Sequence, residues 1–167
     1  MTSLDQLDSD ILGKLDENAR IGMAELSVAL GIARNTAQSR IRRMEDAGVL
    51  QGFSPCVDLE TAGAPVQAFV ALELDQRKMT QVVSALTQFP HVLEINTQLG
   101  REDLLARVAA STHAVLQAIT AQIIEIDGVR HTRTTLITST PLAYRTQPLL
   151  EHLTHQSGFG RSTPAPH

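Results

Sequence analysis

The spacing of apolar residues changes once along this chain, and that change constrains the fold more than any other feature. Up to about residue 47 the apolar residues recur every three or four positions, which is typical of helices with one buried face. From Val66 to Leu74 every second residue is apolar, which is typical of a strand with one buried face. We therefore predict a helical domain at 1–50, an extended linker or hinge strand at 51–65, and a mixed domain at 66–142.

The apolar pattern of residues 1–50 predicts three helices, at Gln6–Glu17, Met23–Leu30 and Arg34–Ala47. Asp5 is placed to cap the first helix, and Gly31 stands in the tight turn between the second and the third. Three helices with a short glycine-containing turn before the last one are typical of a helix-turn-helix domain, including its winged-helix-like forms.

The predicted third helix carries four arginines between Arg34 and Arg43, and no acid lies among them. The formal net charge of the whole chain is -4, but a local cationic patch can still bind phosphates. The competing interpretation is a solvated helix face, although such a face usually mixes both signs of charge. The residues predicted to contact duplex DNA are Arg34, Asn35, Thr36, Gln38, Ser39, Arg40, Arg42 and Arg43.

Different roles are expected along that helix. Arg34, Asn35 and Gln38 belong to its N-terminal half, where arginine can bind guanine and the amides can bind adenine in the major groove. Arg40, Arg42 and Arg43 are expected to hold phosphates. If two copies make about six such contacts, the logarithm of affinity should fall with the logarithm of salt concentration at a slope of about −5.

The second half predicts strand, helix, strand, strand, helix and strand, with strands at about 66–74, 92–99, 104–110 and 129–139. This order indicates an α+β domain of the ferredoxin-like βαββαβ type, with both helices on one face of an antiparallel sheet. Apolar residues also fall on the other face, among them Phe69. We therefore expect the sheets of two copies to associate into a dimer or a larger assembly.

The C-terminal segment 143–167 is expected to be a partly disordered tail. Pro148–Leu153 can form one or two helical turns, whereas Ser157–His167 is rich in Gly, Ser and Pro and is expected to be disordered.

Composition excludes several classes of protein. The lone cysteine, Cys56, excludes an internal disulfide, is expected to be a small apolar residue in a strand, and fits a cytoplasmic protein. The longest stretch without a charge, Val108–Ile124, is interrupted by polar residues, so no membrane span is expected. Aromatic residues make up 3% of the chain, which disfavours stacking on single-stranded nucleic acid.

Enzymatic and metal-binding functions are not indicated either. His152 and His155 have the spacing of metal ligands, but neither flanking segment supplies the further ligands that zinc requires. We find no glycine-rich phosphate loop, nucleophile elbow or spaced carboxylate pair, so we expect no enzymatic activity, no metal and no cofactor.

Over about residues 4–142 the sequence resembles the Lrp/AsnC family of transcriptional regulators. The matching pieces are Leu4-Asp5-x-x-Asp8-x-x-Ile11-Leu12, Glu25-Leu26-Ser27, Gly31-Ile32, Arg40-Ile41-Arg42-Arg43-Met44-Glu45-x-x-Gly48-Val49-Leu50, Gly52-Phe53, Gly100-x-x-Asp103-Leu104-Leu105, and Gly128-Val129 followed by Thr132 and Thr134. Each fragment alone is weak, but their order and spacing together are fairly specific.

The resemblance implies a sequence-specific DNA-binding domain, a ferredoxin-like domain for assembly into dimers and octamers, and an amino-acid-type effector bound between subunits. Asp103 or Glu102 would accept from the ammonium group, while Arg101 or the amides beside Gly100 would bind the carboxylate. The competing interpretation of this loop is a plain hairpin turn. The effector residues that the resemblance implies are Leu99, Gly100, Arg101, Glu102, Asp103, Thr132 and Thr134.

Two residues depart from the family pattern. Ala33 stands where the family usually has a hydroxyl residue capping the third helix, and Glu102 replaces a usual aromatic residue of the effector loop. The second departure supports an alternative, an architectural DNA-binding protein without an effector. A third class is a small-molecule-binding or enzymatic ferredoxin-like protein whose helical domain serves only for assembly.

Overall fold

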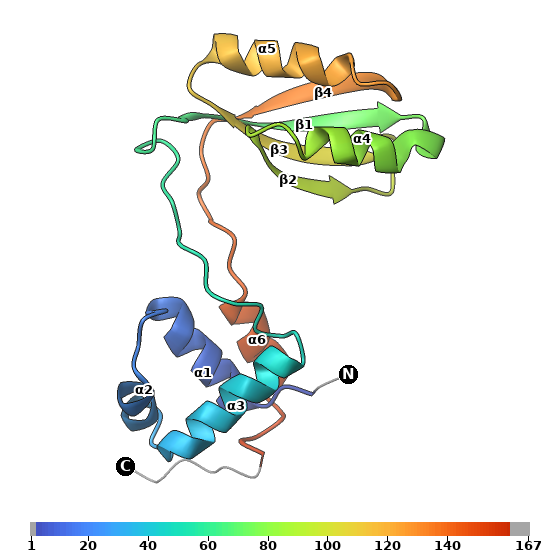
Figure 1. The fold of residues 1–167 in the computed structure, drawn as a ribbon. Helices are drawn as coiled ribbons and strands as arrows, with labels where there is room; N and C mark the ends of the chain where they lie inside the picture. The colour runs from blue at the N-terminus through green and yellow to red at the C-terminus, as the bar shows by residue number, and fades with distance from the viewer. Residues whose placement is uncertain (1–2, 161–167) are drawn as a thin grey trace. The chain divides into compact units, whose positions relative to one another are not determined.

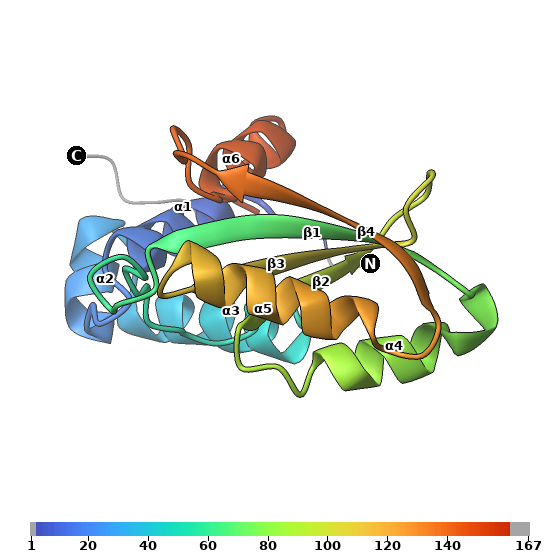
Figure 2. The ribbon, with the colours of Figure 1, turned by 90° about the horizontal axis from the view of Figure 1, so that it is seen from above.

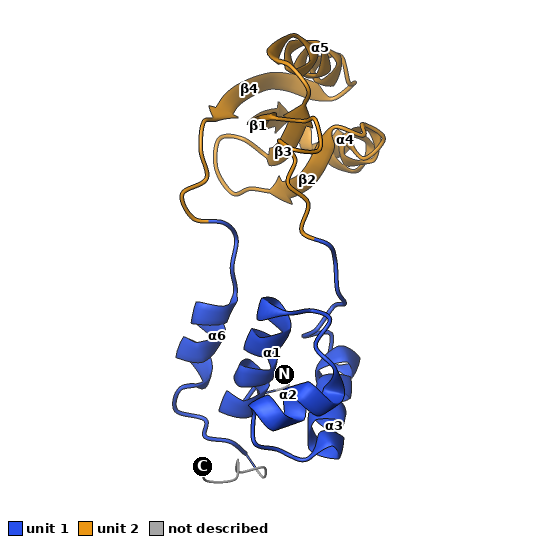
Figure 3. Cartoon of the chain, turned by 90° about the vertical axis from the view of Figure 1, so that its left-hand side faces the viewer, with its two compact units in different colours: residues 1–55, 143–167 blue, residues 56–142 orange. Residues whose placement is uncertain are grey.

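The structure is a computed structural model that describes residues 3–160, and the chain forms two compact units (Figure 3). The first unit contains the chain up to Pro55 and the C-terminal segment from Ala143 onward. The second unit contains Cys56–Leu142. The C-terminal segment therefore belongs with the N-terminal helices, whereas the sequence led us to treat it as a separate tail.

The first unit begins with three helices, α1 (Gln6–Glu17), α2 (Met23–Ala29) and α3 (Arg34–Asp46), each within one residue of its predicted bounds. In the turn before α3, Gly31 has a φ of 62°, a left-handed conformation that favours glycine. The buried core of the three helices consists of Leu7, Ile11, Leu15, Leu26, Ala37 and Met44. The predicted helix-turn-helix arrangement is confirmed (Figure 1).

A further helix, α6 (Gln147–Thr154), packs against α1 (Figures 1 and 3). It confirms the helical turns predicted for Pro148–Leu153. The disorder predicted from Ser157 onward is wrong for residues 157–160, because Phe159 packs against the helical core. The rest of that predicted segment, residues 161–167, lies outside the described residues.

The second unit is a four-stranded antiparallel sheet with strand order β2-β3-β1-β4. Both α-helices of this unit, α4 and α5, cover one face of the sheet (Figure 2), which confirms the ferredoxin-like prediction. The elements are β1 (Val66–Leu74), the 3-10 helix η1 (Gln76–Lys78), α4 (Met79–Leu86), β2 (Val92–Thr97), β3 (Leu104–Ala110), α5 (His113–Ile124) and β4 (Val129–Ile137).

The core of the second unit lies between the sheet and its two helices. Val70 and Leu72 of β1 are fully buried there, together with Leu86 of α4 and Ile123 of α5. On the opposite face, Phe69 lies between Arg107 of β3 and Thr135 of β4 and is 37% exposed. That face therefore presents a large apolar ring to its surroundings.

Residues 51–65 connect the two units without forming a strand. Residues 51–58 are irregular, and a turn follows in which the Thr61 amide donates to Asp58 Oδ1 at 2.7 Å. The expectation that Cys56 is an apolar residue in a strand is wrong, since this cysteine is exposed in the irregular segment. None of the helices in the described range is long and apolar enough to cross a membrane.

Candidate nucleic-acid interface and ligand site

The outer surface of α3 presents most of the polar residues predicted to contact DNA. Arg34, Asn35, Gln38 and Ser39 are exposed, as are Arg42 and Arg43, and Thr36 is half-buried. Arg34 and Arg42 make no ion pair within the described part of the chain. A shallow open depression of about 480 Å³ is lined by Asn35, Gln38, Ser39, Arg42, Arg43 and Asp46. Its donors and acceptors can therefore reach a partner laid along the helix.

Arg40 is not part of this surface, which corrects the sequence prediction. The residue is only 8% exposed, and its Nη1 donates to Asp8 Oδ1 at 3.0 Å and also to Asp5. Its Nη2 lies 3.4 Å from the carbonyl oxygen of Phe159. Arg40 therefore joins α3 to the start of α1 and is not available to a phosphate.

Arg43 is partly exposed and partly engaged by a buried carboxylate. Its Nη2 donates to Asp8, whose carboxylate is fully buried, yet 43% of the Arg43 side chain is exposed. One carboxylate thus holds two arginines of α3. We call Asp5, Asp8, Arg40 and Arg43 the arginine–aspartate cluster.

Asp5 and Asp8 have a second role, because each accepts from the backbone amide of the other at 3.0 Å and so caps α1. Burial acts to raise the pKa of Asp5, but hydrogen bonds from Arg40 and the Asp8 amide, with the charges of Arg40 and Arg43, lower it below 3.8 overall. Burial likewise acts to lower the pKa of Arg40, but Asp5 and Asp8 raise it. Asp5 and Arg40 therefore stay ionised at neutral pH.

The first turn of α3 has no side-chain cap. Ala33 occupies the capping position, and no side chain accepts a hydrogen bond there. The Thr36 amide donates to the Ala33 carbonyl at 2.9 Å, so the amides of Arg34 and Asn35 are the ones left for water or for a phosphate, which helix N-termini bind well.

Asp103, in the loop before β3, has a structural role. Asp103 accepts from the Leu74 amide at 2.7 Å and from Gln76 Nε2 at 3.0 Å, so both of its carboxylate oxygens are engaged. Glu102 pairs with Arg133 of β4 at 2.5 Å. Leu99, Gly100 and Arg101 are exposed. Within one chain, this geometry favours the turn interpretation for Asp103.

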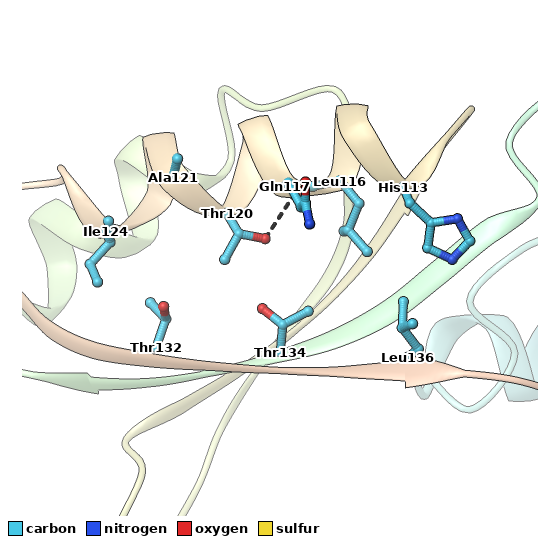
Figure 4. A pocket seen from close by; sticks show the side chains of 9 residues that line it. All are labelled: His113, Leu116, Gln117, Thr120, Ala121, Ile124, Thr132, Thr134 and Leu136. Carbon is cyan, nitrogen blue, oxygen red and sulfur yellow. Dashed lines mark hydrogen bonds between the residues drawn. The ribbon is translucent and has the colours of Figure 1, made fainter.

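Thr132 and Thr134 lie elsewhere, in a groove of about 450 Å³ between β4 and α5 (Figure 4). Thr132 is the register partner of Leu72, whose side chain lies in the helix-covered core, whereas Arg133 follows on the opposite face. Within one chain, Thr132 and Thr134 therefore do not lie beside Glu102. The other groove residues are His113, Leu116, Gln117, Thr120, Ala121, Ile124 and Leu136.

The α5 side of this groove was not predicted from the sequence. His113, Gln117 and Thr120 recur one helical turn apart, and that spacing was the available signal. Thr120 Oγ1 donates to the Leu116 carbonyl at 2.9 Å, so its hydroxyl is engaged by its own helix. Most of the surface that lines the groove is apolar, and none of its side chains is a carboxylate, a lysine or an arginine. Such a groove fits the apolar side chain of a small ligand better than it fits the charged groups of that ligand.

No cluster of three or more metal-ligating side chains occurs among residues 3–160. His152 and His155 are exposed on and just after α6.

Two family models match the chain. Residues 67–147 match the Lrp/AsnC ligand binding domain, and residues 4–51 match a winged helix-turn-helix DNA-binding domain. The chain is 30% identical to the HTH-type transcriptional regulator PH0140 of Pyrococcus horikoshii, over 81% of this chain and 87% of that protein. It is also 30% identical to the regulator AldR of Mycolicibacterium smegmatis, over 80% and 81% respectively.

Solved structures with the same fold include AsnC of E. coli, with a TM-score of 0.81 and 26% identity over 87% of this chain and 99% of that one. A regulator of Neisseria meningitidis, solved in complex with L-Met, has a TM-score of 0.81 and 22% identity over 90% and 99%.

Proposed function

Because the chain belongs to the Lrp/AsnC family of transcriptional regulators, we propose that α3 binds specific duplex DNA sites in the cytoplasm and that an amino-acid-type effector modulates this binding. Regulators of this family are not enzymes. The observation that carries the proposal is the exposed surface of α3, on which Arg34 and Arg42 make no ion pair within residues 3–160.

The roles along α3 follow from exposure. Arg34, Asn35 and Gln38 contact base edges in the major groove, where their paired donors and acceptors distinguish guanine and adenine. Arg42 and the exposed part of Arg43 hold phosphates, and the hydroxyls of Thr36 and Ser39 add polar contacts to the backbone. Without Arg40, two copies of α3 supply about four charged phosphate contacts.

The effector site is completed by a second copy of the chain. The groove between α5 and β4 would take the apolar side chain and place Thr132 and Thr134 beside the polar groups. The loop of another copy would supply the exposed Arg101 for the carboxylate, and Glu102 would exchange its pairing with Arg133 for the ammonium group. The L-Met complex of the Neisseria regulator makes an amino acid a reasonable ligand class to test.

Assembly of two copies through the open sheet face would bring together two α3 helices for DNA and the two chains that the effector site requires. Replacing Phe69 with aspartate should lower the molar mass measured by light scattering toward that of the 18.1 kDa monomer. The dimer should weaken by at least about 100-fold, because a buried aromatic ring is lost and a charge must be buried. The control is Phe53→Asp, since Phe53 is exposed in the irregular segment outside the sheet. Equal mass for Phe69→Asp and wild type would contradict assembly through this face into dimers and, beyond them, octamers.

One experiment tests DNA binding and effector response together. Footprinting on the DNA upstream of the protein's own gene, at several salt concentrations, should show half-sites about one helical turn apart. With about four phosphate contacts, the slope of log affinity against log salt should be about −3.6. Adding the twenty amino acids should change the affinity or the spacing of the protected sites. A slope near zero would contradict the phosphate contacts.

The second candidate is an architectural DNA-binding protein without an effector. It is favoured by the engagement of Glu102 with Arg133 and of Asp103 with β1 and η1, which leaves the loop of one chain with few unused charged groups. This candidate predicts that no amino acid changes the footprint or the thermal unfolding of the protein.

A further inference from the structure

The C-terminal segment 143–160 is built into the helical unit. Gln147 Nε2 donates to the carbonyl of Ser9 on α1 at 3.2 Å. A Cβ atom at Gly13 would lie 2.7 Å from the same Nε2, so the glycine leaves room for the Gln147 side-chain amide against α1. Thr154, at the end of α6, is only 1% exposed. These contacts fix α6 along one face of α1.

After α6 the chain continues to the start of α1. The Gln6 amide donates to the carbonyl of Gly158 at 2.8 Å, and Phe159 packs against the helical core. The carbonyl of Phe159 lies 3.4 Å from Arg40 Nη2. A Cβ atom at Gly160 would lie 2.5 Å from Asp5 Oδ2, so the backbone passes directly over that carboxylate. Residues 158–160 thus cover the arginine–aspartate cluster.

The cluster is the polar connection between α1 and α3. Asp8 is fully buried and holds both Arg40 and Arg43, so a shift of the start of α1 would displace both guanidinium groups. Ion pairs hold a fixed geometry best when water is excluded, because the attraction between the charges is then least screened. Covering the cluster therefore restricts the position of Arg43, which lies at the exposed surface of α3.

We propose that residues 147–160 are a positioning element for DNA binding: by covering the arginine–aspartate cluster, they fix α3 on α1 and set the orientation of Arg43. The proposal rests on the function proposed for α3. The segment itself contacts no DNA in this scheme. Because the chain leaves the helical unit at Pro55 and returns at Ala143, the element also gives that unit a second covalent connection to the other unit.

The test compares full-length variants that loosen the segment. Phe159→Ala removes the apolar contact, and Gly13→Leu forces the Gln147 side chain away from the Ser9 carbonyl without altering the sequence of the segment. Leu153→Ala is the control, since Leu153 lies on α6 within the same segment but is 64% exposed. Binding to the footprinted duplex is measured by fluorescence anisotropy at a temperature at which circular dichroism shows every variant to be folded.

We expect Phe159→Ala and Gly13→Leu each to weaken binding about tenfold, the size of effect typical when a buried contact is truncated. Phe159→Leu should restore most of the affinity, and Leu153→Ala should bind like wild type. Hydrogen exchange of α3 should be faster in the two loosened variants, although both are folded.

Arg42→Ala separates the two levels of the proposal. If Arg42→Ala loses affinity while folded Phe159→Ala and Gly13→Leu bind like wild type, the positioning role is wrong and the function of α3 stands. If Arg42→Ala also binds like wild type, the proposed DNA surface itself is wrong. If Phe159→Ala and Gly13→Leu lose affinity only at temperatures at which they are partly unfolded, the segment contributes stability alone. That result would also overturn the proposal.

Discussion

Replacing Asp8 with alanine should destabilise the helical unit by about 3 kcal/mol, because two arginines lose a buried carboxylate at once. The variant also loses half of the capping box of α1, since the Asp5 amide donates to Asp8 Oδ2 in the native protein. A single domain is usually stable by only about 5–15 kcal/mol, so this loss is a large fraction of the total.

Urea denaturation followed by far-ultraviolet circular dichroism measures this loss, and hydrogen exchange assigns it to α1 and α3. Asp16→Ala is the matched control, because Asp16 lies on the same helix, is exposed and makes no ion pair among the described residues. If Asp8→Ala is no less stable than Asp16→Ala, the cluster does not hold the helices together.

The acid dependence of the same unfolding follows from the lowered pKa of Asp5. A carboxyl group whose folded pKa lies below its unfolded value stabilises the fold above the unfolded value of about 3.8, and this contribution disappears as the pH falls through the lower folded pKa. The stability that the wild type has over an Asp5→Asn variant should therefore be constant from pH 7 to about pH 5 and fall only in stronger acid.

Arg34→Ala and Arg42→Ala should affect DNA binding in different ways. Arg42→Ala should weaken binding to all duplexes alike, by about tenfold or more, and reduce the salt slope by about 2 for a dimer. Arg34→Ala should cost about 1–3 kcal/mol for each base contact on the footprinted site and relax base preference there, with little change on unrelated duplex.

Fluorescence anisotropy on the footprinted duplex and on a scrambled duplex, each at several salt concentrations, distinguishes the two effects. Arg20→Ala is the control for the removal of one exposed positive charge outside α3. If Arg42→Ala changed base preference and Arg34→Ala weakened all duplexes equally, the assigned roles would be exchanged.

The helices of the first unit and the order of elements in the second could be predicted because local physical rules determine them. Asp5 caps α1 through its own side chain, Gly31 adopts the left-handed turn, and the alternation from Val66 to Leu74 indicates one buried strand face. Exposure of Arg34 and Arg42 also follows from a local feature, the polar side of an amphipathic helix.

The role of Arg40 could not be predicted in this way. Helical spacing says which residues share a face, but it does not say which charges on another helix lie opposite them. Asp5 and Asp8 precede Arg40 by more than thirty positions, and only the packing of α1 on α3 brings them together. The same holds for Phe159, which a glycine- and proline-rich segment gave no local reason to place in the core.

The sequence by itself determined the type and order of the main helices and strands and the polar surface of α3, since these depend on contacts between near neighbours in the chain. The tertiary structure decided which cations remain available, where the C-terminal segment lies, and that Thr132 and Glu102 occupy different parts of one chain. These features depend on contacts between distant residues, whose charges and shapes meet only after the elements pack.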